Sequence, residues 1–323
     1  MKQDLHPLKF APILKEKIWG GSKLGSILDK PSKAANIGES WEISDVDGDT
    51  SIVSQGSLKG QSLKQLIVKY KGDLVGNRVY NEFGEKFPLL IKFIDAKQDL
   101  SVQLHPNNNL AAKRHNSFGK TEMWYVMQAD ENANLIVGFN KKVNRQEYMR
   151  HVENKTLSKI LNFESVNKGD TFFIDVGRIH AIGAGVMLAE IQQTSDITYR
   201  VYDWDRVDAQ GNSRELHKDL ALEAIDFNMD DDFKVSYSDR LNTSNQMVKC
   251  PYFTTNFLEV EGEVSIANSK DSFMIYICVE GEVKVDTNQF EELLKKGETV
   301  LIPSSLKNFR LISKGAKLLE VYV

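Results

Sequence analysis

The chain has 323 residues, of which 41% are hydrophobic and 27% charged, and its 41 basic and 45 acidic side chains give a net charge of −4. This composition is typical of a globular protein with a large core, and without a basic cluster we expect no nucleic-acid partner. The sequence has no apolar signal core, no run approaching the ~20 residues of a membrane span, and only two cysteines, Cys250 and Cys278, without CxxC spacing, so we expect a cytoplasmic protein that binds no membrane.

Short runs rich in Val, Ile, Phe, Tyr and Thr dominate the chain and are bounded by Gly, Asn, Asp or Pro, which is typical of strands. We expect strands at 39–45, 87–96, 100–105, 122–129, 133–140, 170–176 and 186–193, and several more across 251–323. Helical spacing occurs in 62–76, in 144–161, which fits one or two short helices, and in 214–227. The apolar positions that repeat on one face are Leu63, Leu66, Ile67 and Tyr70 in the first stretch and Leu216, Leu220 and Ala224 in the last.

A weak internal repeat relates the middle of the chain to its C-terminal part. The segment KGDTFFIDVGRIH (168–180) aligns without gaps on KGETVLIPSSLKN (296–308), and EMWYVMQAD (122–130) aligns on FMIYICVEG (273–281). A recurring turn-strand-turn unit in a β-rich chain predicts two related β-sandwiches or barrels. His180 of the first copy falls opposite Asn308, and Glu122 falls opposite Phe273, so a polar site in the first copy would be lost from the second.

The first copy contains a set of groups that could bind a metal. Gln103 and His105 are two apart at the end of a strand and therefore share a face, Glu122 opens a later strand, and His180 follows a turn that contains glycine. Two imidazoles, a carboxylate and an amide oxygen fit zinc or another divalent first-row metal. Each histidine alone is more often structural, but all four groups lie at the edges of strands within one repeat.

The segment GDTFFIDVGRIHAI (169–182) resembles the second motif of the cupin β-sandwich family, and the whole chain resembles the short bacterial form of type I mannose-6-phosphate isomerases. The matching motifs include PLKFAPILKEKIWGG (7–21), GESWEIS (38–44), LSVQLHP (100–106), GKTEMWYV (119–126) and the stretch 177–206. The resemblance implies a mainly β fold with two cupin-type (jelly-roll) β-sandwich domains and a few short helices. It implies a catalytic metal-binding domain at 1–235 and a degenerate domain without a metal site at 236–323.

The resemblance also implies the site and its chemistry. One zinc ion per chain would be held by Gln103, His105, Glu122 and His180, and mannose 6-phosphate and fructose 6-phosphate would interconvert through a cis-enediol. It implies that Lys120 and Asp196 are the acid–base groups that transfer the proton. It also implies that Arg200 is a cation facing the developing enediolate. Lys92 and Ser101 would bind the phosphate, and Trp19, Glu39 and Glu190 would line the substrate pocket. The partner is then a small phosphosugar, and the chain is expected to be a monomer or weak homodimer.

Alternatives remain open for individual residues and for the whole chain. Lys120 could be an exposed turn lysine, Asp196 and Arg200 could form a surface ion pair, and Lys92, inside an apolar strand, could extend from an edge instead of into a pocket. A non-catalytic sugar-phosphate-binding cupin is the alternative function, and a metal-dependent dioxygenase fits the Gln/His/Glu/His set poorly. Many relatives carry a tyrosine where this chain has Ile182, so a hydroxyl is absent from the expected pocket.

Overall fold

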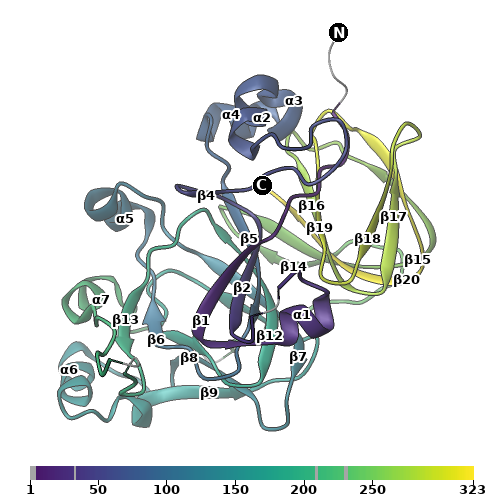
Figure 1. Ribbon diagram of the computed structural model, residues 1–323. Helices are drawn as coiled ribbons and strands as arrows, with labels where there is room; N and C mark the ends of the chain where they lie inside the picture. Colours follow the sequence, from purple (N-terminus) through teal and green to yellow (C-terminus); the bar gives the residue numbers. More distant parts are fainter. Residues whose placement is uncertain (1–4, 33, 208–209, 229–231) are drawn as a thin grey trace.

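The computed structural model describes residues 5–32, 34–207, 210–228 and 232–323, and antiparallel strands are its main secondary structure (Figure 1). The prediction of a mainly β fold with cupin-type sandwiches and few helices is confirmed. Two sheets are built from the first two thirds of the chain and a third sheet from the last third. No helix in the described ranges is long and apolar enough to cross a membrane.

The first sheet has six strands, and the second has five. In spatial order, the first contains β1 (Ile13–Gly21), β2 (Ile37–Ile43), β5 (Leu89–Asp95), β12 (Val186–Gln193), β7 (Glu122–Ala129) and β10 (Thr171–Ile174). The second contains β13 (Tyr199–Tyr202), β6 (Val102–Leu104), β11 (His180–Ile182), β8 (Asn134–Phe139) and β9 (Leu161–Ser165). A short hairpin joins β3 (Asp45–Val46) to β4 (Asp49–Thr50).

The two sheets face each other across a shared apolar core. Ile94, Trp124 and Leu188 of the first sheet belong to the same buried cluster as Leu135 and Ile182 of the second. Because side chains alternate along a strand, residues two apart share this inner face and their neighbours point outward. Lys92, Glu122 and Glu190 share this inner face, because each lies two residues from a member of the cluster on the same strand.

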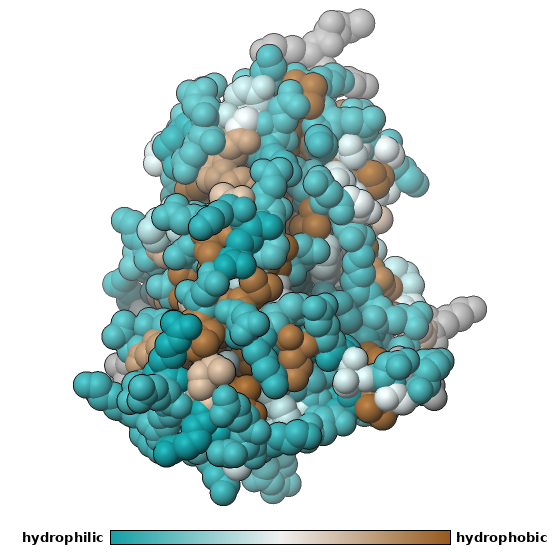
Figure 2. Space-filling view, turned by 90° about the vertical axis from the view of Figure 1, so that its left-hand side faces the viewer, coloured by the Kyte–Doolittle hydropathy of each residue, from teal (hydrophilic) through white to brown (hydrophobic). Residues whose placement is uncertain are grey.

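The outer faces are covered differently. Outward-facing residues of the first sheet, such as Phe93 and Tyr125, pack in one cluster with Phe257 and Leu319 of the last third of the chain. The outer face of the second sheet is covered by α6 (Arg145–Glu153), η1 (Leu157–Ile160) and α7 (Lys218–Ala224). Seen from the side that carries α5 (Asn108–His115), α6 and α7, the surface is mostly hydrophilic, with hydrophobic residues in small groups (Figure 2).

The third sheet runs in the order β14 (Asn245–Lys249), β15 (Thr254–Ala267), β20 (Asn308–Tyr322), β16 (Met274–Glu280) and β19 (Thr299–Ile302), with β17 (Glu282–Asp286) and β18 (Glu291–Lys295) paired beside β20. The long strands β15 and β20 pair with each other, and β15 has a bulge between Val260 and Gly262. Such a bulge bends the strand pair, so that its two halves can belong to the two layers of a sandwich. The predicted domain boundary at residues 235 and 236 precedes this sheet and remains a prediction.

The internal repeat reappears as an equivalent strand pair in each part. Thr171 of β10 pairs with Tyr125 of β7, and Thr299 of β19 pairs with Ile277 of β16. This register differs by one residue from the sequence alignment, so Glu122 corresponds to Met274 and not to Phe273. The polar residue is replaced by an apolar one in either case.

Two of the predicted helices are shorter than expected, and three helices were not predicted. The stretch 62–76 forms α2 (Leu63–Tyr70) and α3 (Gly72–Val75), which are separated at Lys71, where φ is 47°. Only Lys218–Ala224 of the stretch 214–227 is helical, so Leu216 lies outside the helix and is 37% exposed. The segment after Pro106 forms α5, and Asn107 caps this helix by accepting a hydrogen bond from the Leu110 N–H. The other unpredicted helices are α1 (Lys23–Leu28) and α4 (Asn77–Phe83).

Candidate metal centre and active site

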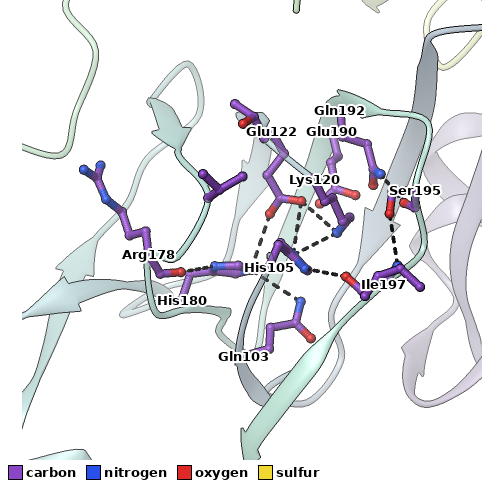
Figure 3. A network of polar contacts seen from close by, with 12 residues as sticks. Gln103, His105, Lys120, Glu122, Arg178, His180, Glu190, Gln192, Ser195 and Ile197 are labelled. Carbon is purple, nitrogen blue, oxygen red and sulfur yellow. Dashed lines mark hydrogen bonds and ion pairs between the residues drawn. The ribbon is translucent and has the colours of Figure 1, made fainter. Parts of the chain in front are cut away.

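His105, Glu122 and His180 converge inside the first sandwich (Figure 3). His105 directly follows β6, Glu122 opens β7 and His180 opens β11, so both sheets contribute to the group. Their nearest ligand atoms all lie within 4.8 Å of one another, and each residue is at most 1% exposed. Three of the four predicted metal-binding residues are thus brought together.

Hydrogen bonds to the backbone fix the orientation of both imidazoles. His105 Nδ1 lies 2.8 Å from the Ile197 carbonyl oxygen, and His180 Nδ1 lies 2.8 Å from that of Arg178. A carbonyl only accepts, so each Nδ1 carries the proton and each Nε2 presents a lone pair. The two Nε2 atoms face the two carboxylate oxygens of Glu122 at 3.5 Å. Backbone bonds of this kind accompany histidines that bind metals.

The electrostatics of the group fit a cation. Burial lowers the pKa of His105 and that of His180, so both rings are neutral, and burial together with Glu190 raises the pKa of Glu122. Glu122 Oε1 is buried and has no hydrogen-bond partner among the described residues. An unsatisfied buried carboxylate facing two imidazole lone pairs is a costly arrangement that a divalent ion would relieve. The residues present therefore fit a metal such as zinc.

Gln103 lies beside this group in a row of residues that crosses the second sheet. It pairs with His180 on one side and with Arg200 of β13 on the other. Gln103 Nε2 is 3.4 Å from His180 Nε2, so the amide nitrogen faces the centre here. A half-turn of the amide, which preserves its shape, would present the oxygen that was predicted as a ligand.

A second row of residues crosses the opposite sheet. Trp41, Lys92, Glu190 and Trp124 are register partners on β2, β5, β12 and β7. Lys92 Nζ is 3.1 Å from Glu190 Oε1 and 5.1 Å from the centre of the Trp41 ring, and Trp124 Nε1 donates to Glu190 Oε2 at 2.8 Å. Lys92 shares the inner face of its strand with Ile94, and its side chain points into the pocket between the sheets.

A pocket of about 350 Å³ opens between the two rows. All eight predicted catalytic and substrate-binding residues line it, together with Gln103, whereas His105, Glu122 and His180 lie behind its wall. The eight are Trp19, Glu39, Lys92, Ser101, Lys120, Glu190, Asp196 and Arg200. Ile182 also lines the pocket, so an apolar side chain stands where a hydroxyl was noted as missing.

Lys120 connects the pocket with the metal-binding group. It is 4% exposed, and its Nζ lies 2.8 Å from Glu122 Oε2 and 3.0 Å from His105 Nε2. It is therefore a buried residue of the site and not an exposed turn lysine. The alternative of a surface ion pair between Asp196 and Arg200 also fails, because Arg200 donates to Ser101 and to the Glu215 carbonyl, no ion pair joins it to Asp196 among the described residues, and both side chains line the pocket.

Charge is distributed unevenly along the pocket. Its four lysines, Lys15, Lys17, Lys92 and Lys120, each have a carboxylate partner, namely Asp49, Glu39, Glu190 and Glu122. Arg200 instead donates to Ser101 Oγ at 3.2 Å and to the Glu215 carbonyl oxygen at 3.0 Å, and forms no ion pair with a described carboxylate. Its end of the pocket therefore carries the less compensated positive charge.

Several lining residues were not predicted from the sequence. Trp41 could have been found, because it is two residues from Glu39 on a strand and must share its face. Arg214 had no such signal: it follows a loop, and Asp203 holds it against the pocket through two hydrogen bonds. His217 was also missed. The ring Nδ1 of His217 accepts a hydrogen bond from the backbone N–H of Arg200 at 3.1 Å, and the backbone N–H of His217 donates to the Arg200 carbonyl oxygen at 2.7 Å. These two bonds fix the backbone of Arg200.

Comparison with known proteins assigns the family. Residues 8–137 match the model of the type I phosphomannose isomerase catalytic domain, and residues 243–323 match that of the mannose-6-phosphate isomerase cupin domain. Mannose-6-phosphate isomerase ManA of Bacillus subtilis is 34% identical over 94% of this chain and 95% of its own, and the Streptococcus mutans enzyme is 32% identical over 94% of each.

Solved structures agree with the sequence relatives. The crystal structure of mannose 6-phosphate isomerase from Bacillus subtilis superposes with a TM-score of 0.89, at 30% identity, over 99% of this chain and all of that one. A putative mannosephosphate isomerase from Archaeoglobus fulgidus, at 22% identity and a TM-score of 0.79, shares the fold. Because this similarity extends along nearly the whole chain, the protein is an isomerase that belongs to the type I mannose-6-phosphate isomerase family.

Proposed function

We propose that the protein interconverts mannose 6-phosphate and fructose 6-phosphate through a cis-enediol, with one zinc ion bound by His105, Glu122, His180 and Gln103. The observation that carries the proposal is the buried His–Glu–His group behind a pocket lined by lysines, arginines and carboxylates. A phosphosugar needs such a mixture: donors and acceptors for hydroxyls, cations for phosphate and acid–base groups for the reacting carbons.

The metal would be held by the two Nε2 atoms and the Glu122 carboxylate, with the Gln103 amide oxygen as a fourth ligand. A zinc ion bound there would supply Lewis-acid stabilisation of negative charge developing on the substrate oxygens. The backbone carbonyls of Ile197 and Arg178 support the site by holding the imidazoles in the required tautomer.

Lys120 and Asp196 are the groups proposed to move the proton. The isomerisation breaks the C2–H bond and forms a C1–H bond, while a hydroxyl proton passes from O2 to O1. Lys120 Nζ is the pocket amine placed next to the metal-binding group, and Asp196, on the loop between β12 and β13, lines the same pocket and is exposed enough to exchange protons. Acid–base groups placed in this way contribute about 10²–10⁴-fold to the rate.

The charge distribution supports one orientation of the substrate along the pocket. Lys92 is compensated by Glu190 and lies near Glu39, so a phosphate beside it would face carboxylates. Ser101 and Arg200 are joined by a hydrogen bond, and strand β6 lies between the strand of Arg200 and that of His180. We therefore propose that the phosphate lies at Ser101 and Arg200, the reacting carbons near Lys120, and the middle hydroxyls at Lys92, Glu190 and Glu39. This departs from the roles implied by the resemblance, which gave Lys92 to the phosphate and Arg200 to the enediolate.

The experiment is a coupled assay of the zinc-loaded protein with mannose 6-phosphate and with free mannose. Isomerisation of mannose 6-phosphate with a clear preference over mannose supports the proposal. A protein that binds mannose 6-phosphate without turnover would instead be the non-catalytic sugar-phosphate-binding cupin. Full turnover after rigorous removal of metal would contradict the metal requirement.

A further inference from the structure

The arginine end of the pocket contains three arginines around one carboxylate. Asp203 is 5% exposed and accepts from Arg214 Nε at 2.7 Å, from Arg214 Nη2 at 2.5 Å and from Arg206 Nη2 at 2.5 Å. Arg200 and Arg214 line the pocket beside Ser101, whereas Arg206 is not among the lining residues and donates to the Asp99 carbonyl oxygen at 2.7 Å. Asp203 therefore anchors one arginine at the pocket and one behind it.

Counting charges shows what this end can bind. At the pocket itself, Arg200 and Arg214 carry two positive charges, and the single charge of Asp203 is shared between Arg214 and Arg206 behind it, which leaves an excess of between about one and two. The nearby Glu215 carboxylate is mostly exposed, so solvent and salt screen it. A phosphate monoester carries a charge of about −1.5 to −2 and three acceptor oxygens. The excess charge thus matches one phosphate group.

The geometry of Arg214 leaves donors for such a group. A guanidinium has five N–H donors in a rigid fork. Asp203 takes two of those of Arg214, along one edge, and three remain for other acceptors. The side chain of Arg214 is 31% exposed, so a ligand in the pocket can reach it, and its two hydrogen bonds to Asp203 hold it in place.

We propose that Arg214, held in place by Asp203, is a second phosphate-binding residue beside Arg200 and sets the preference for phosphorylated over free sugars. This inference rests on the proposed function. It assigns a role to the segment 214–217, in which Arg214 binds the phosphate while the Glu215 carbonyl and the His217 ring hold Arg200.

The test replaces Arg214 by methionine, with Arg206→Met as the matched control because it removes the other arginine bound to Asp203. Hydrogen bonds to charged groups of this kind correspond to a change of about ten- to hundred-fold in binding. In Arg214→Met we expect KM for mannose 6-phosphate to rise by about that factor, kcat to change less than about threefold, and kcat/KM for free mannose to stay constant. Arg206→Met should leave all three within about threefold of the wild type.

A second readout does not depend on turnover. Isothermal titration of the folded proteins with inorganic phosphate should give a Kd that rises about ten- to hundred-fold in Arg214→Met and stays nearly constant in Arg206→Met. Unchanged phosphate affinity in folded Arg214→Met, or equal losses in both variants, overturns the proposal. If Arg214→Met does not fold, Arg214→Lys, which keeps the charge but loses the fork, should still weaken phosphate measurably, and unaltered affinity overturns the proposal there too. Absence of isomerisation in the wild type would refute the proposed function, while the phosphate titrations would still decide the role of Arg214.

Discussion

Replacing Lys120 by methionine should separate the proposed catalysis from the proposed metal binding at this site. The substitution preserves most of the side-chain volume but removes the ammonium that lies 2.8 Å from Glu122 Oε2. Because Lys120 is not a metal ligand, the variant should still bind zinc in the proportion of the wild type. Loss of an acid–base group predicts a fall in kcat of about 10²–10⁴-fold.

The same substitution should affect stability in a way that depends on the metal. Removing one partner of a buried ion pair destabilises a protein by about 3–5 kcal/mol, because the other charge stays buried without compensation. Lys120 and Glu122 are 5% and 0% exposed in their side chains, so in the metal-free protein the loss should approach this range, reduced to the extent that Glu122, whose pKa is raised by burial, takes up a proton. Zinc would compensate Glu122, so the loss of unfolding free energy should be much smaller in the loaded protein.

Lys30→Met provides the matched control. Lys30 and Glu42 form a buried pair at 2.7 Å with side chains 6% and 5% exposed, and neither residue lines the pocket described above. Urea unfolding should therefore show a loss for Lys30→Met that is the same with and without zinc, and the coupled assay should show its kcat unchanged. Lys120→Met with a full complement of zinc and turnover within about threefold of the wild type would remove Lys120 from the mechanism.

Three further outcomes follow from the same structure. Arg200→Met should raise KM for mannose 6-phosphate more than it lowers kcat if the guanidinium binds phosphate with Ser101, whereas a dominant fall in kcat would return it to the developing enediolate. His180→Ala should lose both zinc, measured by elemental analysis, and turnover, and zinc binding at the wild-type level would exclude it as a ligand. Burial raises the pKa of Asp203, but Arg214 and Arg206 outweigh this effect and lower the pKa below its ordinary value. Ionised Asp203 therefore stabilises the folded state fully above about pH 3.9, the pKa in the unfolded chain. This contribution disappears as the pH falls through the lower pKa of the folded state. Asp203→Asn should therefore be less stable than the wild type in urea at about pH 7, with a difference that shrinks in acid; a constant difference would contradict this account.

The features that the sequence predicted best depend on short-range patterns. The period of two along the strand containing Gln103 and His105 placed both on one face, and in the structure Ser101 shares that inner face. Lys92 showed both the strength and the limit of this reasoning. The alternation assigns it a face of β5, but only the packing of a second sheet over that face makes it a pocket residue.

Features that depend on local backbone geometry were predicted less well. The helix after Pro106 has few apolar residues, so its amphipathic pattern is weak, and the cap at Asn107 is its clearest mark. The helix at 62–76 has a continuous apolar pattern, yet the chain breaks it at Lys71 with a left-handed φ. Apolar spacing records which side chains are buried and not whether the backbone is continuous.

The sequence by itself determined that the chain is β-rich, that its two parts share a repeat, and that the polar site belongs to the first copy. Those conclusions need only periodicity and residue type, because strand formation and metal ligation depend on properties of single residues at fixed spacings. The tertiary structure decided which charges are compensated and which are available. The row Trp41–Lys92–Glu190–Trp124 and the anchoring of Arg214 by Asp203 arise from strand register and loop closure, and electrostatic pairing depends on distances between residues that the sequence separates widely.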